Sequence, residues 1–107
     1  MNYDFMRLIL FFDLPVVTKK ERRIYAKYRK FLITRGYMML QYSVYTAIFA
    51  NRDACELEKT ILKKSSPEKG NIRIMMVTEK QYQKMEIIVG GKSNQEEIVT
   101  EDPMIVL

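Results

Sequence analysis

Asp13 stands at the end of a run of large apolar residues, in the stretch LILFFDLP at residues 8–15. A buried strand is a costly place for a charged side chain that has no partner. Asp13 is therefore expected at the strand's tip, where it either forms a turn before Pro15 or belongs to a site that needs a carboxylate. On the residues alone the turn is favoured, because short polar side chains often hydrogen-bond the backbone in turns.

The residue types that are missing limit the chemistry further. The sequence contains no histidine, and Cys55 is its single cysteine. The first absence excludes Ser-His-Asp, Cys-His and histidine-ligated metal sites. The lone cysteine excludes an intramolecular disulfide and a cysteine-based zinc site. Catalysis, if present, depends on carboxylates, Lys, Arg, Tyr, Ser or a bound hard cation.

Positive charge is concentrated in one segment. The net charge is +5, and eight of the eighteen Lys and Arg side chains lie in residues 19–35. At helical spacing they spread over the side opposite an apolar stripe, as expected of a surface that contacts phosphates without reading bases. An ordinary solvated helix face explains the charge equally well. The nucleic-acid-binding candidates are Arg22, Arg23, Lys27, Arg29 and Lys30, with Lys19, Lys20 and Arg52 as secondary candidates near helix ends.

Aromatic and hydroxyl side chains offer weaker signals. Five tyrosines could stack on nucleobases, but a role in the core or an interface is favoured. They are Tyr25, Tyr28, Tyr37, Tyr42 and Tyr45. Ser43 has no histidine to activate it, so it is interpreted as structural or as a phosphate contact.

The first half of the chain predicts a strand, a helix and two strands. The strand covers residues 5–12 and is apolar enough to be central in a sheet. The helix begins near Lys19, because Thr18 and Glu21 have capping-box spacing, and it ends at Gly36. Its apolar stripe consists of Ile24, Tyr28, Phe31 and Leu32. Residues 37–50 predict two strands joined by a corner near residues 40–42.

The second half predicts a helix at 54–64 capped by Asp53, and a strand at 72–78. The helix would bury Ala54, Leu57, Ile61 and Leu62. A short capped turn or helix is expected at 78–81 and a short strand at 85–90. Residues 91–107 form an acidic loop and an apolar tail, and residues 103–107 are too apolar to remain in water, so they are expected to dock on a partner.

Together these elements predict one α+β domain over residues 1–107 with the ferredoxin-like order βαββαβ and additional C-terminal strands. Two helices cover only one face of such a sheet. A two-fold homodimer that stacks sheet on sheet would cover the other face, with the C-terminal strand exchanged onto the partner. The absence of a leader and of a long apolar run predicts a cytoplasmic protein with no membrane contact.

Several stretches resemble a known family when their order and spacing are taken together. These are FFDLP, KERRIYAKYRKFL, GYMMLQYSVY and GNIRIMMVTEKQYQKM. They are similar to the small subunit of the CRISPR adaptation complex, the second CRISPR-associated core protein, often named an endoribonuclease. QYSVY and GGKSNQEEIV resemble the form found in type II systems.

The resemblance implies a ferredoxin-like homodimer that binds duplex DNA and bridges two dimers of the CRISPR integrase during spacer capture. It also implies, for some members, magnesium-dependent cleavage of RNA or DNA. The family's metal-associated aspartate matches Asp13. If two copies of Asp13 meet at the two-fold axis, they either hold Mg²⁺ weakly or share a proton.

We therefore expect a homodimeric, sequence-independent duplex-DNA-binding scaffold, with the integrase subunit as a partner and weak metal-dependent cleavage at Asp13. The alternative is a magnesium-dependent endonuclease of the toxin-like ribonuclease type that cuts RNA or DNA. A ferredoxin-like module that binds a small ligand is a third hypothesis, weakened by the lack of a glycine-rich phosphate loop.

Overall fold

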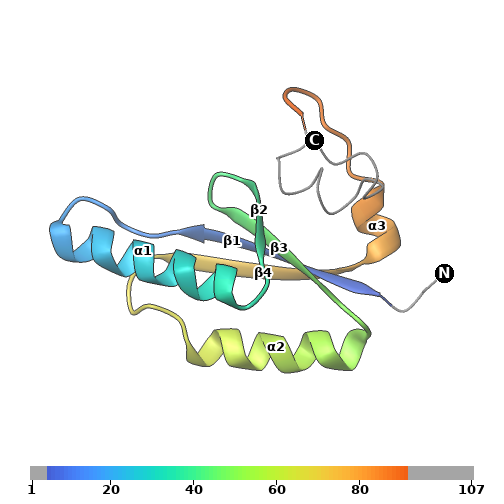
Figure 1. The fold of residues 1–107 in the computed structure, drawn as a ribbon, viewed down its shortest axis with the longest axis horizontal. Helices are drawn as coiled ribbons and strands as arrows, with labels where there is room; N and C mark the ends of the chain where they lie inside the picture. Colours follow the sequence, from blue (N-terminus) through green and yellow to red (C-terminus); the bar gives the residue numbers. More distant parts are fainter. Residues whose placement is uncertain (1–4, 92–107) are drawn as a thin grey trace.

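The computed structural model describes residues 5–91. The elements, in chain order, are β1 (Met6–Asp13), α1 (Lys19–Thr34), β2 (Met38–Gln41), β3 (Val44–Phe49), α2 (Arg52–Lys64), β4 (Asn71–Thr78) and α3 (Glu79–Gln83). Figure 1 shows α1 and α2 on one side of the sheet and α3 at the end of the sheet where β4 finishes. The predicted α+β, ferredoxin-like fold is confirmed.

The sheet has the strand order β2-β3-β1-β4, which places β1 in its interior. β1 runs antiparallel to both β3 and β4. The register opposes Phe11 to Val44 on one side and to Arg73 on the other, and it sets Asp13 opposite Asn71. Because side chains alternate along a strand, these residues share the face that α1 and α2 do not cover.

The helix-covered face of β1 forms the centre of the core. Its buried side chains are Met6, Leu8, Leu10 and Phe12. Phe12 contacts three tyrosine rings, with centroids 5.6 Å from Tyr25, 5.7 Å from Tyr28 and 5.5 Å from Tyr45. Tilted and edge-on aromatic contacts at this range are favourable beyond their buried area. They fix the C-terminal end of β1 against α1 and β3.

The boundaries of α1 are those predicted. The Thr18 hydroxyl accepts from the Glu21 amide at 3.0 Å, and the Glu21 carboxylate accepts from the Thr18 amide at 2.9 Å. These backbone hydrogen bonds hold the pKa of Glu21 below its ordinary value. Gly36 ends the helix with φ of +95°, a left-handed conformation that favours glycine.

The prediction for α2 was wrong in two respects. Asn51, not Asp53, caps the helix, because its side chain accepts from the Ala54 amide at 2.8 Å, and the helix begins at Arg52. The buried face also differs, since Leu57 is 65% exposed. The side chains that α2 buries are Cys55, Glu58 and Leu62.

Glu58 is buried because it has polar partners at the end of α1. Its carboxylate accepts two hydrogen bonds from the Arg35 guanidinium, at 2.7 and 3.0 Å, and one from the Tyr37 hydroxyl at 3.1 Å. The hydrogen bonds from Arg35 hold the pKa of Glu58 below its ordinary value of 4.5. This cluster fastens the C-terminal end of α1 to the middle of α2.

The remaining elements follow the sequence closely, with one exception. The turn between β2 and β3 occurs at residues 42–43, where Ser43 has φ of +66°, and Thr78 forms a second capping box with Gln81. The predicted strand at 85–90 is wrong, because these residues have no strand pairing in a single chain. Its apolar side chains are exposed, with Ile88 at 93%. The tail at 92–107, including residues 103–107, lies outside the described residues.

The face of the sheet that α1 and α2 leave uncovered is only partly shielded. α3 packs on the start of β1, where Arg7 makes two 2.8 Å hydrogen bonds to Glu79 and lies 3.9 Å over the Tyr82 ring. Ile48, opposite Arg7 on β3, is exposed, and so are Met75 and Phe11 farther along the face. No helix within residues 5–91 is long and apolar enough to cross a membrane.

The Glu58 cluster makes the free energy of unfolding depend on pH in the acidic range. Because the folded-state pKa of Glu58 is lowered, its ionic contribution is complete above pH 4.5 and is lost as the pH falls through the folded-state value. Glu58→Gln should lower the free energy of unfolding at neutral pH by about 1–3 kcal/mol. Urea titrations should show this difference shrinking below pH 4.

The matched control is Glu56→Gln, since Glu56 is an exposed partner of Lys59 one turn away. It should cost less than about 1 kcal/mol. Equal losses for the two variants, or a Glu58→Gln effect that is constant with pH, would contradict the role given to the cluster.

Candidate nucleic-acid interface

Asp13 ends β1 on the uncovered face of the sheet, and it is exposed. It lines a shallow hollow of about 450 Å³ with Ser43, Asn71 and Arg73 among its neighbours. The Phe12 amide donates to the Ser43 carbonyl at 3.0 Å, which holds the β2–β3 turn beside the end of β1. Two other elements, the β2–β3 turn and β4, therefore bring polar side chains to Asp13.

Gly70 allows β4 to begin this close to Asp13. It has φ of +103°, and a Cβ atom there would lie 2.7 Å from both the Asp13 carbonyl oxygen and Leu14 Cδ2. Any larger residue would have to displace the end of β1. The position of the Asp13 backbone thus depends on a residue without a side chain, 57 positions later in the sequence.

The Asp13 carboxylate has no hydrogen bond or ion pair to any residue within 5–91. The turn interpretation required such a bond to the backbone before Pro15, and the described residues do not show one. A carboxylate with no partner among the described residues is a candidate ligand.

The donor atoms around Asp13 are of the kind that Mg²⁺ prefers, but one chain supplies few of them. Hard oxygen ligands are present in the Asp13 carboxylate, the Asn71 amide and Ser43. Arg73, on the same face, adds a competing positive charge. The described part of the chain contains no cluster of three acidic, histidine or cysteine side chains suited to a metal. Residues 5–91 of one chain therefore provide only part of a magnesium site.

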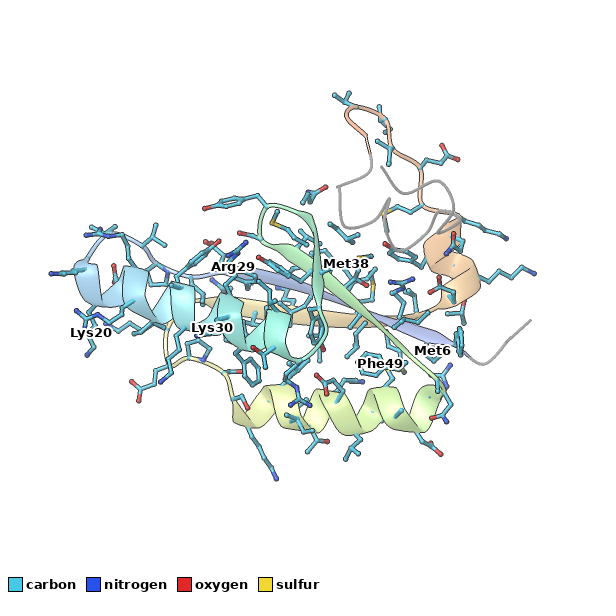
Figure 2. All side chains as sticks on the ribbon, in the orientation of Figure 1. Met6, Lys20, Arg29, Lys30, Met38 and Phe49 are labelled. Carbon is cyan, nitrogen blue, oxygen red and sulfur yellow. The ribbon has the colours of Figure 1, made fainter. Side chains whose placement is uncertain are left out.

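The predicted basic residues lie along α1, all of them exposed. Figure 2 shows Lys20, Arg29 and Lys30 spaced along this helix. At 3.6 residues per turn the seven cations cover about half of the helix circumference, opposite Tyr28 and Leu32. Within the described ranges none of the seven forms a salt bridge. These seven, Lys19, Lys20, Arg22, Arg23, Lys27, Arg29 and Lys30, are called the α1 cation surface.

Two members of this surface also have structural partners. Arg22 donates to the carbonyls of Val16 at 3.2 Å and Val17 at 2.6 Å. Arg29 donates to the Tyr45 hydroxyl at 2.9 Å. The acceptors are all neutral, so the two arginines keep their full charge. Arg22 also holds the β1–α1 loop, and Arg29 holds the contact between α1 and β3. Substituting them would disturb the fold as well as the surface.

The other members divide by position. Lys19, Arg23 and Lys30 lie at the centre of the exposed arc and contact only solvent among the interactions seen in residues 5–91. Lys20 and Lys27 lie at one edge, where they line a groove between α1 and the loop at 65–69. Arg52 starts α2 at the opposite end of the molecule from the start of α1 (Figure 1), so it is separate from the surface.

The expectation that the tyrosines belong to the core is confirmed for Tyr28, Tyr37 and Tyr45, which are buried. Tyr25 is half-buried, and burial raises the pKa of its hydroxyl. Tyr42 is 78% exposed at the tip of the β2–β3 turn, so it lies outside the core of a single chain. Its alternative place in an interface stays a prediction.

Asn71 and Arg73 were missed by sequence reasoning. Both lie on β4, whose antiparallel pairing with β1 sets them on the face of Phe11 and Asp13. The alternation of polar and apolar residues in NIRIM was the available signal, but only the register identifies the face.

A family model described as "CRISPR associated protein Cas2" matches residues 6–85. A protein named "CRISPR-associated endoribonuclease Cas2" from Treponema denticola is 42% identical over 102 residues, covering 95% of this chain and all of the relative. Relatives of the same name from Acidovorax ebreus and Streptococcus mutans are 45% and 44% identical, covering 79% and 81% of this chain and 83% and 80% of their own.

Proposed function

This chain belongs to the Cas2 family of CRISPR-associated proteins, and on that premise we propose that it is a homodimeric scaffold that binds duplex DNA without sequence preference during spacer acquisition. The observation that carries the proposal is the α1 cation surface, because its charge is not neutralised by carboxylates within residues 5–91. Positive side chains held on a rigid helix suit a polyanion.

The shape of the surface suits a duplex. A helix of 16 residues is about 24 Å long, which is about seven base pairs of B-DNA. Its long, flexible cations can reach phosphates, and phosphate contacts carry no sequence information. Binding is therefore expected to depend on salt and not on sequence.

The central cations of the surface provide the test. Lys19→Gln, Arg23→Gln and Lys30→Gln in one variant should weaken binding to a blunt duplex, because phosphate contacts are lost. The slope of log affinity against log salt should fall in magnitude by about 0.9 for each lost contact. Fluorescence anisotropy with a labelled duplex at several salt concentrations measures both quantities.

The matched control changes three exposed lysines away from α1, namely Lys63, Lys64 and Lys80, to Gln. It removes the same net charge and should leave the slope nearly unchanged. If the two triple variants lose affinity equally, only total charge matters and the α1 surface is not the interface.

A second copy of the chain is proposed to cover the open face of the sheet. Phe11, Ile48 and Met75 expose apolar side chains there, and solvent exposure of such a cluster is unfavourable. The segment 85–89 adds four more exposed apolar side chains next to α3. Exchange of the C-terminal segment between two copies would bury the apolar side chains of the open face and those of residues 85–89. Two Asp13 residues would then lie near a shared two-fold axis.

Ile48→Glu should break this dimer, since Ile48 lies on the open face and is 45% exposed. The control is Leu57→Glu, which alters a side chain exposed on α2 instead. Sedimentation equilibrium should give twice the 12.7 kDa chain mass for the wild type and for Leu57→Glu, and a single-chain mass for Ile48→Glu. A wild-type monomer, or an undisturbed Ile48→Glu dimer, would contradict this assignment.

The scaffold is further proposed to bridge two dimers of the CRISPR integrase. The support is family membership together with the symmetry of a dimer, which presents the α1 cation surface twice. The integrase subunit is thus the expected protein partner, and genes for it should neighbour the gene for this chain.

A magnesium-dependent endonuclease is the second candidate. It is favoured by the Asp13 carboxylate, which has no partner within residues 5–91, and by the relatives' name, which calls them endoribonucleases. Asp13 from two copies would hold the ion with help from Asn71, and Mg²⁺ would polarise a phosphodiester of RNA or DNA. The small donor set indicates weak binding of the ion.

Asp13→Asn should abolish any cleavage that requires Mg²⁺ and leave duplex binding equal or tighter, because a negative charge is removed. Asp53→Asn, at an exposed carboxylate on α2, is the control. Gel assays on short RNA and DNA with Mg²⁺ or a chelator read out both activities. Cleavage that persists in Asp13→Asn would remove Asp13 from the chemistry.

A further inference from the structure

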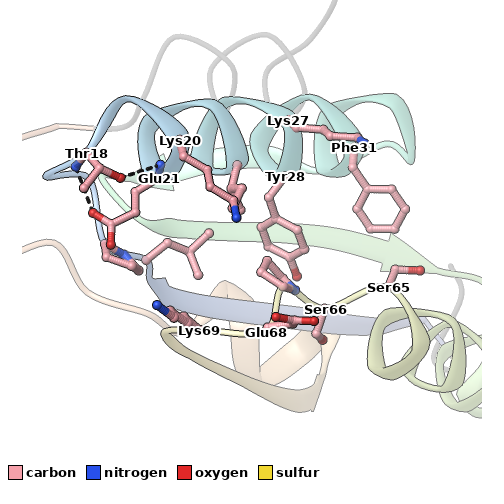
Figure 3. Close-up of a pocket in the computed structure, with 14 residues that line it drawn as sticks. Thr18, Lys20, Glu21, Lys27, Tyr28, Phe31, Ser65, Ser66, Glu68 and Lys69 are labelled. Carbon is pink, nitrogen blue, oxygen red and sulfur yellow. Dashed lines mark hydrogen bonds between the residues drawn. The ribbon is translucent and has the colours of Figure 1, made fainter.

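A groove separates α1 from the loop that joins α2 to β4. It encloses about 640 Å³, within the range of small-ligand pockets. Its apolar wall includes Ile24, Tyr28 and Phe31 of α1, and Pro67 faces them from the loop. Figure 3 shows the α1 side chains on one side and Ser65, Ser66, Glu68 and Lys69 on the other.

The charges at the rim of the groove favour an anion. Lys20 and Lys27 come from α1 and Lys69 comes from the loop, so cations lie on both sides. Glu21 also lines the groove, but its carboxylate is occupied by the backbone amides of the α1 cap. Glu68 is the one other acid that lines this groove in the described residues.

The Tyr28 hydroxyl lies at the groove without a partner. It is buried and makes no hydrogen bond to the residues described. Burial raises the pKa of Tyr28 to about 12, so the hydroxyl is protonated and able to donate at neutral pH. An unpaired buried hydroxyl is costly and rare in folded proteins. A small shift of the 65–69 loop would let an entering polar group reach it.

We propose that this groove binds a single nucleotide, with the flat base between the apolar side chains and the Tyr28 hydroxyl, and the phosphate beside Lys20 and Lys69. The base needs a narrow apolar wall with a polar group at its end, and the phosphate needs cations at the rim. The nucleotide would be either free or the unpaired end of a bound strand. The second source rests on the proposed function, because it requires a duplex on the adjacent α1 cation surface.

The probes are AMP, adenosine, inorganic phosphate, a blunt duplex and the same duplex with a single-stranded adenine overhang. Amide shifts from ¹⁵N NMR of the wild-type chain should move at Tyr28, Ser66 and Lys69 on addition of AMP, and less with adenosine or phosphate alone. If the overhang instead tightens duplex binding without an AMP response, the strand end is the source of the nucleotide. If AMP binds and the overhang adds nothing, the source is a free nucleotide.

Two variants test the assignment. Tyr28→Phe removes the unpaired hydroxyl and should weaken nucleotide binding about 3- to 10-fold without loss of stability. Lys69→Gln should weaken AMP but not adenosine. Neither side chain belongs to the α1 cation surface, so both variants should bind the blunt duplex as the wild type does.

The inference is overturned if neither AMP nor the overhang is recognised, or if both variants bind the recognised probe like the wild type. These outcomes differ from a failure of the proposed function, which would appear as blunt-duplex binding that ignores the central α1 cations.

Discussion

The alternation of side chains along β1 determines the rest of the structure. Even-numbered residues from Met6 to Phe12 enter the core under α1 and α2, and odd-numbered residues from Arg7 to Asp13 point to the opposite face. Because α1 and α2 both lie on one face, the outer side of α1 is free to carry cations. Within residues 5–91 the other face is covered only by the short α3 at the start of β1, so it exposes Phe11 and presents Asp13 at its end. Both proposed interfaces therefore follow from the pleat of a single central strand.

The charged side chains fall into two groups, those that form ion pairs within the fold and those that face solvent. The buried Arg7 is paired with Glu79, and the buried Glu58 is paired with Arg35, so each ion pair contains a buried charge that would be costly if unpaired. The cations of α1 have no such pairing among residues 5–91 and keep their charge toward solvent. Their mutual repulsion is relieved when phosphates approach, so the same arrangement favours binding of a polyanion.

Local signals in the sequence predicted most of the fold. The two Thr capping boxes at Thr18 and Thr78, the glycine stop at Gly36 and the tight corner near residue 42 all depend on neighbouring residues, and each was found in place. The failures involve distant partners. Glu58 was not among the side chains that α2 was predicted to bury, because Arg35 and Tyr37, which satisfy its carboxylate, are more than twenty positions away. Residues 85–90 have strand-like composition, but they do not pair with any strand of the described sheet.

The candidate site also combines features that local sequence patterns predict with features that depend on distant parts of the chain. Asp13 became a candidate through the resemblance to the family, whereas the α1 cations were candidates because residue type and helical spacing place them on one surface. Asn71, Arg73 and the need for Gly70 depend on the register of β4 against β1, which no local pattern specifies. The groove beside Tyr28 depends on where the 65–69 loop lies over α1, and that position follows from the packing of both helices.

Sedimentation of the wild-type chain with a blunt duplex, at low and at physiological salt, tests the central claim most directly. A dimeric scaffold predicts a complex that contains two chains per duplex, dissociates steeply as salt rises and forms equally on unrelated sequences. A monomeric chain on the DNA, or binding that salt does not weaken, would contradict it.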